Sequence, residues 1–303
     1  MAQNNTNQTM EQPMTLWQEY IDTEALINVC ETWVVFGVSL LQLCILLKLI
    51  WNERIKPTLL AFFKASLTRF NVMLFSMILI MFLVSLPLDS TQIWFNTYSN
   101  LLISGFHILA LYYSWFRGIP VIDVLMPMVR PYVFAWLVVY SILLAIIDAL
   151  IIVIDFSLNS EFQDIMKNYL GYLDVVSGFL AFGFEAFVVG VYGYYLWRMK
   201  EQDFGVNTSR ERIICIYGAI GTLFIFLLQL SIILVVNWTQ LEVPTVSVEL
   251  LTIVLSVQAF SPTAYLFVQL AMKRALFVNK KNAPALNQGS DKAATNQKSI
   301  KAL

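Results

Sequence analysis

Residues 132–154 have the sequence YVFAWLVVYSILLAIIDALIIVI, in which Asp148 is the only charged side chain. A helix that crosses the hydrocarbon core of a bilayer needs about 20 apolar residues, each adding about 1.5 Å along the helix axis. The run lacks the regular alternation of apolar and polar residues that is typical of barrel strands. The stretch therefore predicts a transmembrane helix.

Further apolar runs of this kind occur along the chain. Together they predict membrane spans at 32–51, 70–88, 97–116, 132–154, 172–197, 213–236 and 246–272. The composition agrees, because 58% of the residues are hydrophobic and only 13% are charged, which is more apolar surface than one soluble core could bury. We expect an all-α membrane protein, a seven-transmembrane helix bundle whose main partner is the lipid bilayer.

The positive charges predict the orientation of this bundle. Lys and Arg close to the ends of spans are retained in the cytoplasm, because moving them across the membrane is costly. With the N-terminus outside, every one of the 19 Lys and Arg residues except Lys167 falls on the cytoplasmic side. If one span were missed, all later Lys and Arg residues would move to the opposite side and the bias would disappear. The sequence therefore predicts an outer N-terminus and a cytosolic C-terminus.

This topology divides the chain into three parts. Residues 1–31 form an extracellular N-terminal segment, whose triplets at Asn4 and Asn7 are candidate N-glycosylation sites. Residues 32–272 form the transmembrane domain. The glycosylation triplets favour the secretory pathway, and we expect the plasma membrane as the location, although the triplets do not specify it. Residues 273–303 combine Lys273 and Arg274 with apolar Leu276, which predicts a short amphipathic eighth helix on the inner leaflet. A disordered polar tail should follow it.

Ionisable residues within spans are candidates for ligand binding, because each needs a partner, a wet cavity or a role. They are His107, Asp148, Asp174 and Glu185. Asp174 and Glu185 are eleven residues apart, which places them on almost the same helix face, and this face could line a cavity that opens outward. Glu185 and His107 lie at equal depth and could form a pair. The alternative for each residue is a purely structural hydrogen bond within the bundle.

The segment Ser261-Pro262-Thr263-Ala264-Tyr265, near the inner end of the seventh predicted span, resembles the Asn-Pro-x-x-Tyr motif of rhodopsin-like G-protein-coupled receptors. Arg117, at the end of the third span, matches the arginine of that family's acidic-Arg-Tyr motif, and Ser261 stands where the family has asparagine. The resemblance implies that Arg117, Ser261, Pro262 and Tyr265 form a switch. It also implies that the cytoplasmic face engages a heterotrimeric G protein.

An enzyme is not expected. One histidine and scattered cysteines cannot supply the ligands of a closed zinc site, and we find no nucleophile motif, so we predict neither catalytic residues nor a metal or other cofactor. The net charge of −1 does not favour nucleic acid as a partner. We expect a receptor for an unknown extracellular ligand. The alternatives are a proton- or cation-coupled transporter or channel subunit that uses Asp148, Glu185 and His107, and a membrane scaffold.

Overall fold

The computed structural model describes residues 8–53, 66–86, 93–157, 160–201, 209–239 and 248–282. These ranges contain no strand. The helices are α1 (Gln8–Glu53), α3 (Arg69–Val84), α4 (Ile93–Leu125), α5 (Arg130–Phe156), α6 (Ser160–Glu201), α7 (Ser209–Thr239) and α8 (Val248–Asn282), with a short 3-10 turn, η1 (Pro127–Val129), between α4 and α5. The predicted all-α class is confirmed.

Six of these helices are long and apolar enough to cross a bilayer. They are α1, α4, α5, α6, α7 and α8, and they agree with an integral, multi-pass membrane protein. The second predicted span, at 70–88, corresponds to α3, whose described length of 16 residues falls short of the length that a bilayer requires. The seventh crossing therefore stays a prediction.

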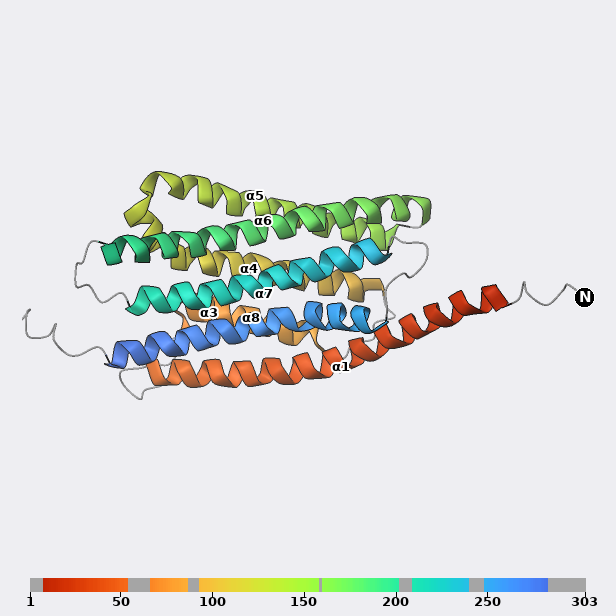
Figure 1. Ribbon diagram of the computed structural model, residues 1–303, viewed down its shortest axis with the longest axis horizontal. Helices are drawn as coiled ribbons and strands as arrows, with labels where there is room; N and C mark the ends of the chain where they lie inside the picture. Colours follow the sequence, from red (N-terminus) through yellow and green to blue (C-terminus); the bar gives the residue numbers. More distant parts are fainter. Residues whose placement is uncertain are drawn as a thin grey trace, which may run out of the picture.

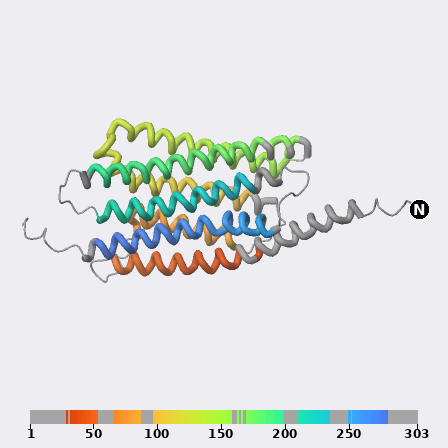
Figure 2. The backbone as a smooth tube through the Cα atoms, in the orientation of Figure 1, coloured from red at the N-terminus to blue at the C-terminus, as the bar shows by residue number. Residues whose placement is uncertain are grey.

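The helices lie side by side in one elongated bundle (Figures 1 and 2). Helices that follow one another along the chain are antiparallel neighbours, and the ring closes because α8 packs against α1 as well as α7. Helix α4 is in contact with α3, α5 and α6. Side chains on α4 can therefore reach several other helices, which makes α4 the central element for any internal site.

Both faces of α5 are apolar. On α5 the buried side chains recur every three or four residues, from Val133 through Leu137, Tyr140 and Leu144. The opposite face is equally apolar but exposed, with Val139 57% and Ile142 55% accessible. A helix in water would place polar residues there, so this face is suited to contact lipid.

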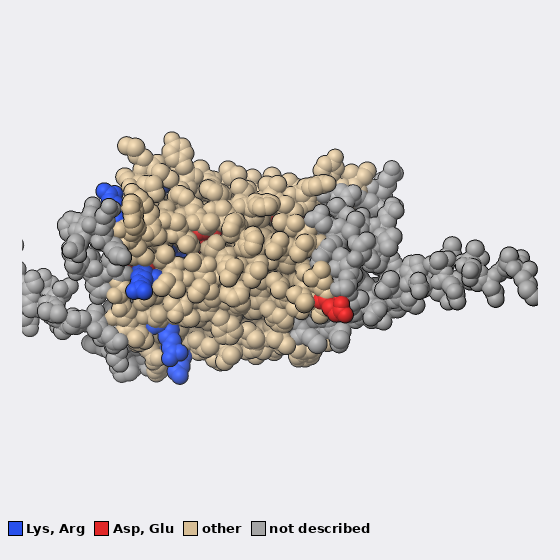
Figure 3. All heavy atoms as spheres, viewed as in Figure 1, with Lys and Arg blue, Asp and Glu red and all other residues tan. Residues whose placement is uncertain are grey.

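Charged side chains are distributed unevenly along the bundle. Figure 3 shows Lys and Arg gathered near one end and an almost uncharged central band. This is the end at which α1, α4, α6 and α8 finish and α3, α5 and α7 begin (Figure 1). The described basic side chains toward this end are Lys48, Arg69, Arg130, Arg198, Arg210, Arg212, Lys273 and Arg274. We refer to it as the basic end.

Two expectations about helix ends are corrected. Helix α4 continues through Pro120 to Leu125, so Arg117 lies within the helix and is only 7% exposed, not on the cytoplasmic surface. Helix α8 runs unbroken through Pro262 to Asn282, and no separate amphipathic eighth helix occurs within the described ranges. The physical reason is that residues 266–282 hold no glycine or proline that would end a helix.

Three other predictions fall outside the described residues. They concern the glycosylation sites Asn4 and Asn7, and the disordered tail after residue 282.

Candidate functional site

The buried guanidinium of Arg117 on α4 forms hydrogen bonds with side chains of α8. One of its nitrogens, Nη1, donates to Oε1 of Gln269 at 2.9 Å and to the sulfur of Met272 at 3.1 Å. The guanidinium also lies over the ring of Tyr113, with 5.1 Å between Cζ and the ring centroid. Removing a cation from water is costly, and these contacts offset part of that cost. They also fasten α4 to α8.

A serine hydroxyl connects Arg117 to a buried carboxyl group. Nη2 of Arg117 donates to Oγ of Ser114 at 3.2 Å, and this hydroxyl in turn donates to Oε1 of Glu185 on α6. Glu185 is only 1% exposed. The hydroxyl accepts from the cation and donates to the carboxyl group, so the two hydrogen bonds form a chain from Arg117 to Glu185 in which each bond strengthens the other. We call Arg117, Ser114, Glu185, Gln269 and Met272 the Arg117 network; it joins α4, α6 and α8.

Two tyrosines border the Arg117 network. The hydroxyl of Tyr192 on α6 donates to the backbone carbonyl of Arg117. Tyr265 of α8 lies within electrostatic range of Arg117 and Glu185. Its buried hydroxyl interacts with Ser114 of the network, although it makes no hydrogen bond of good geometry within the described residues. A Cβ atom on Gly221 of α7 would lie 3.3 Å from the Tyr265 ring, so α7 also approaches the network closely.

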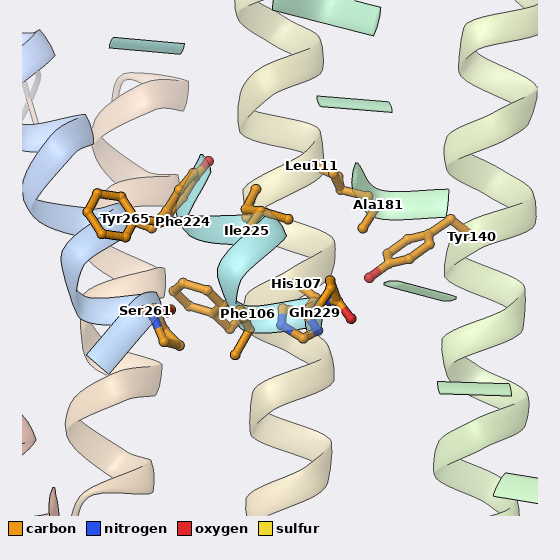
Figure 4. Close-up of a pocket in the computed structure, with 13 residues that line it drawn as sticks. Phe106, His107, Leu111, Tyr140, Ala181, Phe224, Ile225, Gln229, Ser261 and Tyr265 are labelled. Atoms are coloured by element: carbon orange, nitrogen blue, oxygen red, sulfur yellow. The ribbon is translucent and has the colours of Figure 1, made fainter. Parts of the chain in front are cut away.

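A small cavity lies in the bundle beside the network, lined by residues of α4, α5, α6, α7 and α8 (Figure 4). Its free volume is about 20 Å³. Apolar side chains and Pro262 form most of the wall. The polar side chains that line it are His107, Tyr140, Gln229, Ser261 and Tyr265. Tyr265 therefore borders both the cavity and the Arg117 network.

The ionisable residues predicted from the sequence do not form one site. Glu185 bonds Ser114, whereas His107 lines the cavity, where its Nε2 has no partner among the described residues. The hypothesis that these two side chains pair was therefore wrong. Asp148 accepts a hydrogen bond from Ser104 at 2.7 Å, and Asp174 lies within electrostatic range of Asp148.

The residues suggested by the receptor resemblance lie closer together. Arg117 is the centre of the network and Tyr265 borders it, while Ser261 and Pro262 line the adjoining cavity. The hydroxyl of Ser261 donates to the carbonyl of Val257 one turn earlier in α8, at 2.5 Å. That bond stays within the helix, so Ser261 is left without a direct link to Arg117.

Sequence reasoning missed several polar residues that complete the site. Ser114 and Gln269 carry the network, and Gln229 and Tyr140 line the cavity. Gln229 and Gln269 did carry a signal, because an amide within an apolar helix needs a partner. Ser114 also lies one helical turn before Arg117, where its side chain shares the same face.

A second polar cluster lies toward the basic end of the bundle. Nζ of Lys273 on α8 contacts Oε1 of Glu53 on α1 at 2.7 Å and donates to Oδ1 of Asn71 on α3 at 2.5 Å. Asn71 is 1% exposed and also donates to Glu53 at 3.4 Å. We call these three residues the three-helix clamp. It holds α8 only one residue beyond Met272 of the Arg117 network.

No group of three or more His, Cys, Asp or Glu side chains that could hold a metal ion occurs in the described part of the chain. Comparisons with protein-family models, with curated proteins and with solved structures found no match. The function must therefore be inferred from the geometry of this chain.

Proposed function

We propose that the chain is a seven-helix, receptor-like protein of the plasma membrane, with its N-terminus outside and its basic end in the cytosol. It transmits the binding of an external ligand to a cytosolic partner, for which a heterotrimeric G protein is the first candidate. The collection of Lys and Arg toward one end of the bundle supports this orientation, because cationic side chains are retained on the cytoplasmic side.

The observation that carries the proposal is the Arg117 network. One buried cation holds α8 through Gln269 and reaches α6 through Ser114 and Glu185. Separating these helices would leave a buried charge without partners, which typically costs about 3–5 kcal/mol. Such an arrangement can exist in two discrete packings, and a ligand that favours one of them shifts the population.

The free energy needed to separate the helices that the Arg117 network joins is of the size expected for a two-state switch. A shift from 1:99 to 99:1 between two states needs about 5.5 kcal/mol of differential ligand affinity. The cost of breaking a buried charge network is of similar size. Weakening the network should therefore populate the second arrangement without ligand. In a receptor, this effect appears as raised basal signalling.

The test is nucleotide exchange by purified G proteins with the full chain in lipid vesicles. Arg117→Lys keeps the charge but lacks the planar fork that reaches Gln269 and Ser114 together. We expect this variant to raise basal exchange several-fold relative to the unmodified chain. Arg130→Gln is the matched control, because Arg130 pairs with Asp123 on the surface, where its side chain is 53% exposed.

The receptor proposal fails if no class of G protein exchanges nucleotide faster with the unmodified chain or with Arg117→Lys than with empty vesicles. Receptor expression and insertion are checked in the same vesicles by the amount of protein recovered. A normal result for Arg130→Gln beside an altered one for Arg117→Lys assigns the effect to the buried network.

A transporter remains the second candidate, because polar residues recur along one side of α4. Ser104, His107, Ser114 and Arg117 are separated by three, seven and three residues, spacings that return to similar faces of a helix. Ser104 bonds Asp148 and Ser114 bonds Glu185. Proton or cation flux into vesicles that is lost in Glu185→Gln would favour this function. The absence of flux would exclude it.

A further inference from the structure

The cavity between α4 and α8 has a polar side. His107 from α4, Tyr140 from α5 and Gln229 from α7 converge there. Figure 4 shows the hydroxyl of Tyr140 directed toward Gln229 and His107. Tyr140 is 1% and Gln229 is 7% exposed, so these groups belong to the interior of the bundle. The remaining walls are mainly apolar.

One buried polar atom in the cavity wall has no hydrogen-bond partner among the described residues. It is Nε2 of His107. An unpaired buried polar group costs about 1–3 kcal/mol, and nearly all such groups in folded proteins are paired with protein or with water. The unpaired His107 nitrogen, beside a cavity that Tyr140 and Gln229 also line, therefore indicates a bound group that pairs with it.

The size and chemistry of the cavity restrict what this group can be. A volume of about 20 Å³ is enough for one water-sized group, which typically makes about three hydrogen bonds. No Asp, Glu, Lys or Arg lines the cavity, so the group is uncharged. A histidine nitrogen, an amide and a phenol each suit a partner that can both donate and accept, which is the property of a hydroxyl.

We propose that this cavity is a binding site for one water molecule, held by His107 with Tyr140 and Gln229. A volume of about 20 Å³ leaves no room for the carbon atoms of an alcohol. This site does not depend on the receptor function, since a hydrated cavity would exist in any bundle with this packing.

Selective isotope labelling of histidine tests the site, because the chain contains a single histidine and the signal needs no further assignment. The experiment measures magnetisation transfer to the His107 ring in the full chain in detergent, first from water and then from the methyl protons of added ethanol. Transfer from water alone supports the trapped water molecule. Transfer from ethanol would require a larger cavity and overturns the proposal, as does the absence of transfer from water.

Ala181→Leu on α6 places a larger side chain in the cavity wall, where Ala181 is 4% exposed. We expect the transfer to His107 to disappear in this variant. Ala186→Leu is the matched control, because Ala186 lies on the exposed face of the same helix. If Ala181→Leu retains full transfer and the near-UV circular dichroism of the unmodified chain, the bound group lies elsewhere and the proposal is wrong. The measurement on the unmodified chain decides the question even if this variant does not fold.

Discussion

Ser114 has a larger role than its size indicates, because its hydroxyl accepts from Arg117 and donates to Glu185. In Ser114→Ala both neighbours lose this bridge inside the bundle. Leaving buried polar groups unpaired typically costs about 1–3 kcal/mol. We expect a lower midpoint of thermal unfolding in detergent. Ser141→Ala is the control, because the Ser141 hydroxyl donates to the Leu137 carbonyl one turn earlier in its own helix, and the midpoint of this variant should hardly change.

Gly178 and Gly190 of α6 allow a matched pair of substitutions. A Cβ atom on Gly178 would lie 2.0 Å from Oε1 and 2.6 Å from Cδ of Gln229, whereas a Cβ atom on Gly190 meets nothing within 4 Å. Gly178→Ala must therefore displace Gln229, at a cost of about 1–3 kcal/mol. Gly190→Ala should be neutral or stabilise the helix by up to about 1 kcal/mol. Equal unfolding midpoints for the two variants would contradict this packing.

At the scale of the element, α8 shows what a single sequence can and cannot predict. The apolar run and Pro262 indicated a helix with a special position, and the motif around Tyr265 indicated a switch. Gln269 could not be assigned in advance, because its role depends on the approach of Arg117 from α4, which is 152 positions away in the chain. Which polar side chains on different helices meet depends on how the helices pack, and the periodicity of the sequence does not predict this.

Helix α8 is fastened to three helices within about one turn, since Gln269 and Met272 contact α4 and Lys273 contacts α1 and α3. In a double-mutant cycle on the three-helix clamp, we expect the effects of substituting Lys273 and Glu53 on the free energy of unfolding to be strongly coupled. Side chains of Lys273 and Glu53 are 11% and 30% exposed. Their alanine variants should be coupled by more than the roughly 0.2–1 kcal/mol typical of exposed pairs.

The exposed pair of Asp123 and Arg130 provides the comparison for this cycle. Its side chains are 38% and 53% exposed and its atoms are 3.2 Å apart. Both cycles are measured from thermal unfolding of the full chain. A coupling energy for Lys273 and Glu53 no larger than for the exposed pair would show that the clamp contributes little to holding α8.

For the whole molecule, the all-helical bundle could be predicted because lipid imposes one requirement on every spanning segment, namely that backbone hydrogen bonds are satisfied within the segment. The local sequence is then sufficient to predict that each spanning segment is a helix. The predicted ends were less accurate: α1 begins at Gln8, well before residue 32, and α4 continues to Leu125. Hydropathy marks where lipid begins and ends, whereas a helix continues for as long as its backbone and neighbours permit.

The orientation of the whole molecule yields the last prediction. The proposed seven crossings would place the two termini in different compartments, and the charge bias predicts that the N-terminus is outside. An N-terminal epitope tag should bind antibody on intact cells, and a C-terminal tag only after permeabilisation. Glycosidase treatment should lower the apparent mass of the unmodified chain, and the double variant Asn4→Gln, Asn7→Gln should already have the lower mass. If both tags are accessible on the same side, the described part of α3 does not belong to a complete span, the number of crossings is even, and the proposed receptor topology is wrong.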